Sequence, residues 1–202
     1  KTYGTVLLKN IVGDARFSFP KSLYSVHDSL KYFVDEKPNA LILDFFAGSG
    51  TTLQAVNLLN AEDGGHRRCI MVTNNEVSAD EAKMLKDKGY QPGDEEWEKL
   101  GIANYVTWPR TVCSIKGQDV NGNPLKGDYL GSEPPMHMAD GFKANAAFFK
   151  LGFLDPTAVS LGMRFSEMLP TLWLKTGSKG KCPELTGEQV PDMLILSENQ
   201  FA

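Results

Sequence analysis

The sequence predicts an α/β protein with a partial, doubly wound parallel sheet that carries helices on both faces, followed by a mixed α/β tail. Two observations favour this fold class. Two short apolar runs, residues 40–43 (ALIL) and 69–72 (CIMV), are each followed by a polar stretch and then by a segment with helical spacing. This is the order of elements in parallel sheets. Two glycines one residue apart, Gly48 and Gly50, mark the turn after the first run.

The first predicted elements are a helix and the strand that follows it. Apolar residues recur at helical spacing from Leu23 to Phe33, which predicts a helix over residues 22–34, and Ser22 can cap its first turn. Residues 37–39 (KPN) break the chain before the first apolar run. We expect that run to form a strand buried on both faces.

Further helices follow each predicted strand. Residues 51–60 place leucine and valine on one side of a helix directly after the glycines. Ser78 and Glu81 form a capping box for a helix over residues 79–88. A short helix is expected over residues 94–100.

The tail has weaker signals. The Asn121-Gly122 pair predicts a hairpin turn between residues 112 and 129. Residues 117–139, rich in glycine and proline, are the best candidate for a flexible insertion. The apolar run at residues 146–151 predicts another strand.

The last part of the chain predicts one long helix and one strand. The helix begins at Pro156 and continues towards Gly177, with Pro170 expected to kink or split it. The final apolar run, residues 193–196, predicts a strand.

The composition is that of an ordinary globular domain. The chain has 202 residues, is 42% hydrophobic and carries a net charge of -4. No apolar run is long enough to cross a membrane, and the first ten residues lack the pattern of a signal peptide. We therefore expect a cytoplasmic protein with no membrane partner. The sequence contains no stripe of basic residues, which would predict strong binding to nucleic acid.

The cysteines and histidines suggest neither disulfides nor a metal. Three scattered cysteines include no CxxC pair, and the three histidines share no ligand spacing with acids. Cys182 precedes Pro183, whereas a cytosine C5 methyltransferase would need the opposite order. We expect free thiols and no metal.

The glycine turn could in principle hold one of three ligands. A triphosphate-binding loop needs a lysine after its last glycine, but Thr51 stands there. A dinucleotide fingerprint needs a small residue three places after Gly50, and that position is Leu53. Both of these ligands are therefore disfavoured.

The third ligand fits the spacing better. An acid at the strand end, Asp44, stands four residues before Gly48, and its carboxylate could pair with an ammonium group. S-adenosylmethionine carries such a group, and Asn75 or Glu76 after the second strand could hold its ribose hydroxyls. The alternative is a tight turn in which Asp44 is only a cap.

Three segments resemble a known family. They are residues 17–23 (FSFPKSL), 43–52 (LDFFAGSGTT) and 72–76 (VTNNE). They are similar to the cofactor-binding segments of amino-directed DNA methyltransferases, in particular the permuted β-group of adenine-specific enzymes that includes modification subunits of type III restriction systems. The resemblance covers roughly residues 1–110 well and implies a Rossmann-like, S-adenosylmethionine-dependent fold that methylates adenine N6 in DNA.

The resemblance also implies site residues and a division of the chain. Residues 1–110 would be an S-adenosylmethionine-binding half-domain, and residues 111–202 a C-terminal extension packed on the same sheet. Phe19 has an alternative role as an ordinary core aromatic, and the ribose role is open between Asn75 and Glu76. The implied cofactor-binding residues are Phe19, Pro20, Lys21, Asp44, Phe45, Ala47, Gly48, Gly50, Thr51, Thr52, Asn75 and Glu76.

The catalytic motif of this family, an Asp, Asn or Ser followed by Pro-Pro and an aromatic, is missing from the sequence. Residues 132–136 (SEPPM) have a glutamate before the prolines and no aromatic after them, and residues 155–157 (DPT) have one proline. In the permuted order that motif precedes the FPK block. We therefore expect the C-terminal portion of a longer enzyme, inactive in isolation, with no catalytic residue of its own.

Three partners follow from this expectation. DNA would be bound through the missing N-terminal region, and a restriction subunit is a further candidate. The edge of the first strand would be uncovered, which predicts self-association through that edge. The alternative function is a degenerate cofactor domain that acts as a binding or scaffolding module of a restriction-modification complex.

Overall fold

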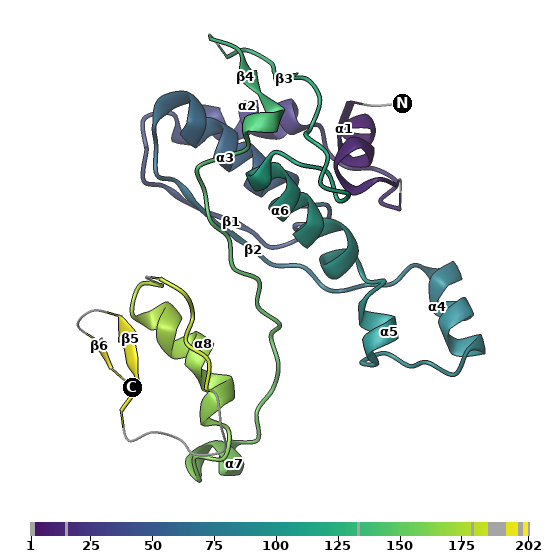
Figure 1. The fold of residues 1–202 in the computed structure, drawn as a ribbon, viewed down its shortest axis with the longest axis vertical. Coiled ribbons are helices and arrows are strands. Elements are labelled where there is room, and N and C mark those ends of the chain that lie inside the picture. The colour runs from purple at the N-terminus through teal and green to yellow at the C-terminus, as the bar shows by residue number, and fades with distance from the viewer. Residues whose placement is uncertain are drawn as a thin grey trace. The chain divides into compact units, whose positions relative to one another are not determined.

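A computed structural model describes residues 3–14, 16–132, 134–178, 180–185, 193–197 and 200–201. The chain divides into two compact units, residues 1–148 and 149–202. The first contains the elements from α1 to η2, and the second contains α7, α8, β5 and β6 (Figure 1). Residues 111–148 thus belong structurally to the first unit, whereas the assignment of cofactor binding to residues 1–110 stays a prediction.

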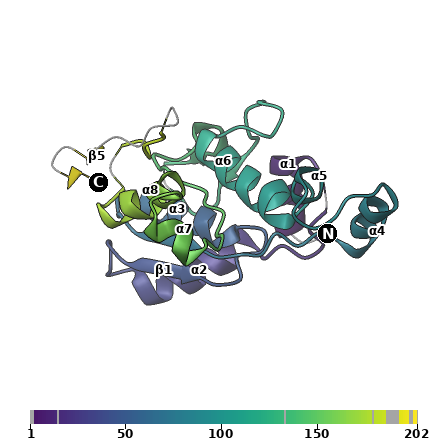
Figure 2. The same cartoon turned by 90° about the horizontal axis from the view of Figure 1, so that it is seen from below.

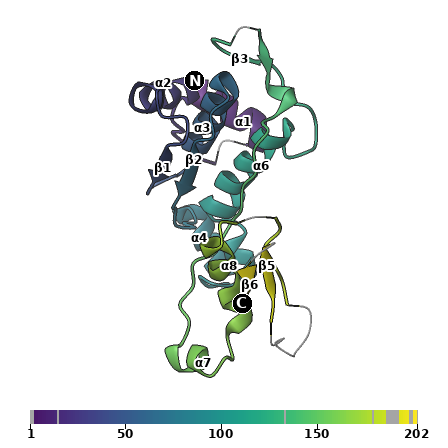
Figure 3. The same cartoon turned by 90° about the vertical axis from the view of Figure 1, so that its left-hand side faces the viewer.

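The two predicted strands pair as a parallel sheet. β1 (Leu41–Asp44) runs beside β2 (Arg68–Met71), with Leu43 opposite Ile70 in the register. α3 (Thr51–Asp63) connects them, and Figure 3 shows it next to the two strands. The α/β class is therefore confirmed. No third parallel strand occurs in the described ranges, so the doubly wound sheet remains a prediction.

The expectation that the first strand is buried on both faces is wrong. Leu41 and Leu43 are 55% and 58% exposed, and Ile70 on the neighbouring strand is 50% exposed. Ile42 and Cys69, which alternate with them, are only partly exposed. Because side chains alternate along a strand, one face of the sheet is covered and the other is open.

Helices α1 (Tyr3–Val12), α2 (Leu23–Val34), α3 and α6 (Trp108–Lys116) build the core of the first unit. α2 packs along α3 and lies beside β1 (Figure 2). Ser22 stands at the first position before α2 but makes no side-chain capping bond. The buried core consists of Leu7, Leu8, Ile11, Val12, Leu23, Ala55, Leu58, Val106, Cys113, Leu125, Tyr129, Met138 and Phe142.

The capping-box helix is confirmed as α4 (Ala79–Asp87). The Ser78 hydroxyl accepts a hydrogen bond from the Glu81 amide at 3.4 Å and donates one to the Glu81 carboxylate at 2.7 Å. The short helix is confirmed as α5 (Glu95–Glu98). A π-helical segment, η1 (Ala103–Thr107), leads directly into α6, and the sequence predictions missed both.

The predicted hairpin and flexible insertion need correction. α6 occupies residues 112–116, and the turn at Asn121-Gly122 closes only an isolated bridge between Gln118 and Pro124. A short hairpin follows, formed by β3 (Asp128–Tyr129) and β4 (Met136–His137), and it leads into the 3-10 helix η2 (Met138–Asp140). The described part of residues 117–139 is no flexible insertion, because it contributes three residues to the core: Leu125, Tyr129 and Met138.

Two predictions for the chain after residue 145 are wrong. The strand expected at residues 146–151 is absent: this stretch has no regular structure, and Leu151, at 97% exposure, packs against no sheet. The expected long helix is two helices, α7 (Pro156–Ser160) and α8 (Phe165–Lys175). The break falls where Gly162 takes a left-handed conformation with φ 73°, and α8 continues through Pro170.

The last strand is present but shifted. β5 (Ile195–Ser197) pairs antiparallel with β6 (Gln200–Phe201). The strand predicted at residues 193–196 thus starts at Ile195, two residues later than expected. Across the described part of the chain, the helices are too short or too polar to traverse a lipid bilayer.

The stability of the β3–β4 hairpin should depend on pH because of one ion pair within it. His137 Nδ1 lies 2.6 Å from the Asp128 carboxylate, which raises the pKa of His137. The charged pair therefore favours the hairpin at low pH, and this contribution is lost as pH rises through the raised pKa. We expect Asp128→Asn to lower the pKa of His137 towards that of a free imidazole, and NMR titration of the imidazole measures this change. An unchanged pKa in the variant would contradict this account.

Candidate functional site

The glycine turn joins β1 to α3 in the predicted place. Gly48 and Gly50 have φ values of 50° and 75°, in the left-handed region that other residues rarely adopt. Gly50 is also the residue that immediately precedes α3. The two glycines therefore let the chain reverse between the end of the strand and the first turn of the helix.

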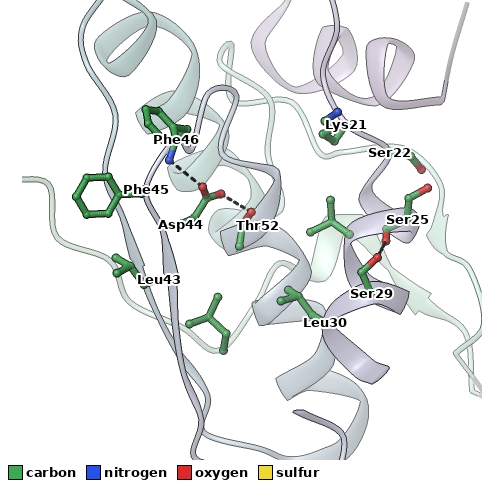
Figure 4. A pocket seen from close by; sticks show the side chains of 12 residues that line it. Lys21, Ser22, Ser25, Ser29, Leu30, Leu43, Asp44, Phe45, Phe46 and Thr52 are labelled. Carbon is green, nitrogen blue, oxygen red and sulfur yellow. Dashed lines mark hydrogen bonds between the residues drawn. The ribbon is translucent and has the colours of Figure 1, made fainter. Parts of the chain in front are cut away.

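Asp44 closes this turn from the end of β1. Its Oδ1 accepts a hydrogen bond from the Phe46 amide at 3.1 Å, and its Oδ2 accepts one from the Thr52 hydroxyl at 2.5 Å (Figure 4). These bonds agree with the interpretation of Asp44 as a cap. Each carboxylate oxygen can accept a second bond, and the residue is only partly buried, so a ligand can still reach it.

A cavity of about 600 Å³ lies beside the turn, between α2 and β1. Figure 4 shows Asp44 and Thr52 on one side of it and the serines of α2 on the other. Lys21 contributes to its wall. The remaining lining residues are Ser22, Ser25, Val26, Ser29, Leu30, Ile42, Leu43, Phe45 and Phe46.

The FPK segment lies against α1. A Cβ atom added to Gly4 would stand 2.6 Å from the Pro20 carbonyl oxygen and 2.7 Å from that of Lys21, so the absence of a side chain permits this contact. Pro20 is buried, whereas Phe19 is 88% exposed. The alternative in which Phe19 is a core aromatic is therefore wrong.

Asn75 and Glu76, the two candidates after β2, have different surroundings. Asn75 uses its amide internally: Nδ2 donates to the Glu98 carbonyl at 2.8 Å, and Oδ1 accepts from the Asn104 amide at 3.2 Å. Glu76 is exposed and lines a second cavity of about 200 Å³. Of the two, Glu76 is thus the side chain available to a ligand.

The second cavity combines charged and apolar walls. The Arg16 guanidinium stands 3.8 Å from the centre of the Tyr105 ring and 3.0 Å from the Glu81 carboxylate. The Tyr105 hydroxyl donates to Asp14 at 2.9 Å, which raises the pKa of Tyr105. The other lining residues are Ser78, Leu100, Ile102 and Val106.

Sequence reasoning missed Thr107, which holds the turn from the junction of η1 and α6. Its hydroxyl donates to the Gly48 carbonyl at 2.5 Å. A Cβ on Gly50 would stand 3.2 Å from its methyl group. Gly50 is therefore needed for close packing as well as for its backbone conformation.

Arg110, in the first turn of α6, is the second residue that was missed. Its side chain is fully buried, and burial lowers its pKa to about 10, so it stays protonated at neutral pH. Its Nη1 donates to the Thr51 hydroxyl at 2.7 Å and to the Ser49 hydroxyl at 3.1 Å. The signal that could have found this helix is Pro109 near its start and Gly117 at its end.

Residues 9–114 match the DNA methylase family. The chain belongs to the DNA methylase family. The matched range contains the FPK segment, the glycine turn, Glu76 and Arg110. The resemblance deduced from the three sequence segments is thereby confirmed.

Similar proteins include two modification subunits of type III restriction systems. The chain is 40% identical over 87 residues to the EcoPI Mod subunit of Escherichia phage P1, which covers 43% of this chain and 13% of that protein. It is 38% identical over 86 residues to the StyLTI Mod subunit of Salmonella typhimurium, with the same coverage of 43% and 13%.

A third similar protein is the type II methyltransferase M.KpnI of Klebsiella pneumoniae. The identity is 44% over 68 residues, which covers 34% of this chain and 16% of that protein. The match to this chain thus spans between 13% and 16% of the length of these relatives.

Proposed function

We propose that this chain is the cofactor-binding portion of a site-specific DNA methyltransferase that moves the methyl group of S-adenosylmethionine to adenine N6. The observation that carries the proposal is the placement of two accessible carboxylates near the carboxyl ends of two adjacent parallel strands: Asp44 is the last residue of β1, and Glu76 follows β2. Ligands of α/β sheets bind at this edge. The names of the relatives, modification subunits and a methyltransferase, support the same activity.

The residues present fit S-adenosylmethionine. The remaining lone pairs of Asp44 suit its ammonium group, and the left-handed glycines leave the turn without side chains that would block a ligand. Glu76 suits the ribose hydroxyls, and Ile102 and Val106 offer apolar walls for the base. When bound, the cofactor supplies an electrophilic methyl group.

The contribution of this chain to catalysis would be binding and orientation. Asp44 and Glu76 would fix the two ends of the methyl donor, and Pro20 and Lys21 would form a wall near the turn. Holding a donor in one orientation lowers the entropic part of the barrier for a direct displacement. The sequence has no Pro-Pro-aromatic motif, so we propose that the target adenine and the DNA are bound by another part of the enzyme, and that this chain alone does not methylate DNA.

The open face of the sheet is the proposed contact surface. Leu41, Leu43, Phe45, Ile70 and Val72, here called the open sheet face, are between 38% and 62% exposed. Within the described ranges β1 pairs only with β2, so its other edge is open as well. We propose that another part of the methyltransferase, or a second copy of this chain, covers the face and the edge. A restriction subunit remains a further proposed partner.

Calorimetric titration of the purified chain with S-adenosylmethionine tests the proposed function. We expect saturable binding that Asp44→Ala weakens at least about 10-fold, because a charge-assisted hydrogen bond contributes roughly 1.5–3 kcal/mol. Asp87→Ala, which removes an exposed carboxylate at the end of α4, is the matched control and should bind normally.

Two outcomes would contradict the proposal. Absence of binding by the unaltered chain would favour the scaffolding alternative. Equal affinities for Asp44→Ala and the unaltered chain would mean that Asp44 serves only to cap the turn.

A further inference from the structure

One buried arginine, Arg110, donates hydrogen bonds to the glycine turn. Arg110 lies on α6, and its Nη1 contacts three oxygens of the turn: the Thr51 hydroxyl at 2.7 Å, the Ser49 hydroxyl at 3.1 Å and the Ser49 carbonyl at 3.3 Å. Its Nε donates to the Gln54 side chain at 3.0 Å, one turn further along α3. Arg110 therefore bonds to residues on both sides of Gly50.

The charge of Arg110 is not balanced by an acid in the described part of the chain. None of the ion pairs found there involves Arg110, and its Nη2 has no hydrogen-bond partner. Burying an unpaired charge costs folding free energy. Stability alone is thus a poor reason for an arginine at this position.

Arg67, a second buried arginine, provides the contrast. Its guanidinium pairs with Asp63 at 2.7 Å and donates to the carbonyls of Val34 and Asp35, at the opposite end of α3 from the turn. The buried guanidinium of Arg67 thus has both a carboxylate partner and hydrogen-bond acceptors, as expected of a structural residue. Arg110 directs its bonds to the turn and leaves one nitrogen unpaired.

The turn needs such support because glycine restricts the backbone least. Gly48 and Gly50 are both left-handed, and Thr107 and Arg110 on the neighbouring segment donate hydrogen bonds to Gly48, Ser49 and Thr51. Bonds to Ser49 and Thr51 fix the orientation of both residues that flank Gly50. Loss of these bonds would let the turn sample other conformations before a ligand arrives.

We propose that Arg110 is a positioning residue for the methyl donor, which holds the turn from Gly48 to Thr51 in the conformation that binds it. This inference rests on the proposed function. The side-chain hydrogen-bond partners of Arg110, which are Ser49, Thr51 and Gln54, do not line the cavity of about 600 Å³ beside the turn. Arg110 would therefore act on the donor through the turn.

The test compares Arg110→Met with Arg67→Met, which removes an equally buried guanidinium far from the turn. Titration with S-adenosylmethionine, below the unfolding temperature of both variants, should show binding at least about 10-fold weaker for Arg110→Met and unchanged for Arg67→Met. Hydrogen exchange without ligand should quicken at residues 47–53 in Arg110→Met, and at the α2–α3 contact in Arg67→Met.

The two readouts separate the possible failures. If the unaltered chain binds no donor but exchange at residues 47–53 still quickens in Arg110→Met, the proposed function fails, and with it the role toward the donor, while Arg110 is shown to order the turn. If both variants bind like the unaltered chain, or both weaken equally, the positioning role is wrong.

A milder pair of variants covers the case in which Arg110→Met does not fold. Ser49→Ala removes a hydroxyl that Arg110 contacts at 3.1 Å, whereas Ser114→Ala removes a buried hydroxyl of α6 that donates to the Thr111 carbonyl, away from the turn. We expect weaker donor binding and faster local exchange for Ser49→Ala, with unchanged behaviour for Ser114→Ala. Equal behaviour of the two variants would overturn the proposal.

Discussion

Gly50→Ala is expected to destabilise the chain by about 3 kcal/mol and to remove detectable binding of the methyl donor. Gly50 has φ 75°, where a side chain adds strain of about 1–2 kcal/mol. Its new Cβ would also stand 3.2 Å from the Thr107 methyl and 3.4 Å from the Thr107 carbonyl oxygen. Thr107 cannot easily give way, because its hydroxyl donates to the Gly48 carbonyl.

Gly64→Ala is the matched control for this prediction. Gly64 ends the same helix with φ 71°, but an added Cβ meets nothing within 4 Å. It should therefore cost only the backbone strain, about 1 kcal/mol, and leave donor binding intact. Urea denaturation measures both variants. Equal losses of stability would show that the contact with Thr107 contributes nothing.

Charging the open sheet face is expected to abolish self-association without unfolding the chain. Leu43 and Ile70 face each other across β1 and β2 and are 58% and 50% exposed. Leu43→Glu together with Ile70→Lys would place an opposite-charge pair on that face, so the free energy of unfolding should change by less than about 0.5 kcal/mol. Sedimentation over a range of concentrations would show oligomers for the unaltered chain and a monomer for the variant.

Met84→Lys on α4 is the control for this second prediction, since Met84 is an apolar residue with 43% exposure on another element. It should associate as the unaltered chain does. A clean monomer of the unaltered chain at high concentration, with no binding of a hydrophobic dye, would refute the proposed contact surface.

The sequence predicted the elements around the glycine turn because their signals are local. The apolar runs of β1 and β2, the glycines and the Ser78 capping box each depend on a few neighbouring residues. Their parallel pairing follows from the helix between them. The open face could not be predicted, because an apolar strand is the same in sequence whether or not a second layer covers it.

The missed residues depend on contacts between distant parts of the chain. Thr107 and Arg110 lie 59 residues from the groups they hold, Gly48 and Thr51, and no local pattern connects them. The strand predicted at residues 146–151 is wrong for the opposite reason: its composition suits a strand, but in the described part of the chain no strand pairs with it. Residues 117–139 were misinterpreted for another reason: their composition is typical of turns, and it does not show that three of their residues are core positions.

The continuous segment formed by η1 and α6 touches both proposed halves of the ligand site. Tyr105 and Val106 line the smaller cavity near Glu76, while Thr107 and Arg110 hold the glycine turn. A π-helical segment is a rare and adjustable piece of backbone. We therefore expect any shift of this segment to alter both proposed subsites, the one near Glu76 and the one at the glycine turn, so that their binding free energies would not be additive and neither could be changed without the other.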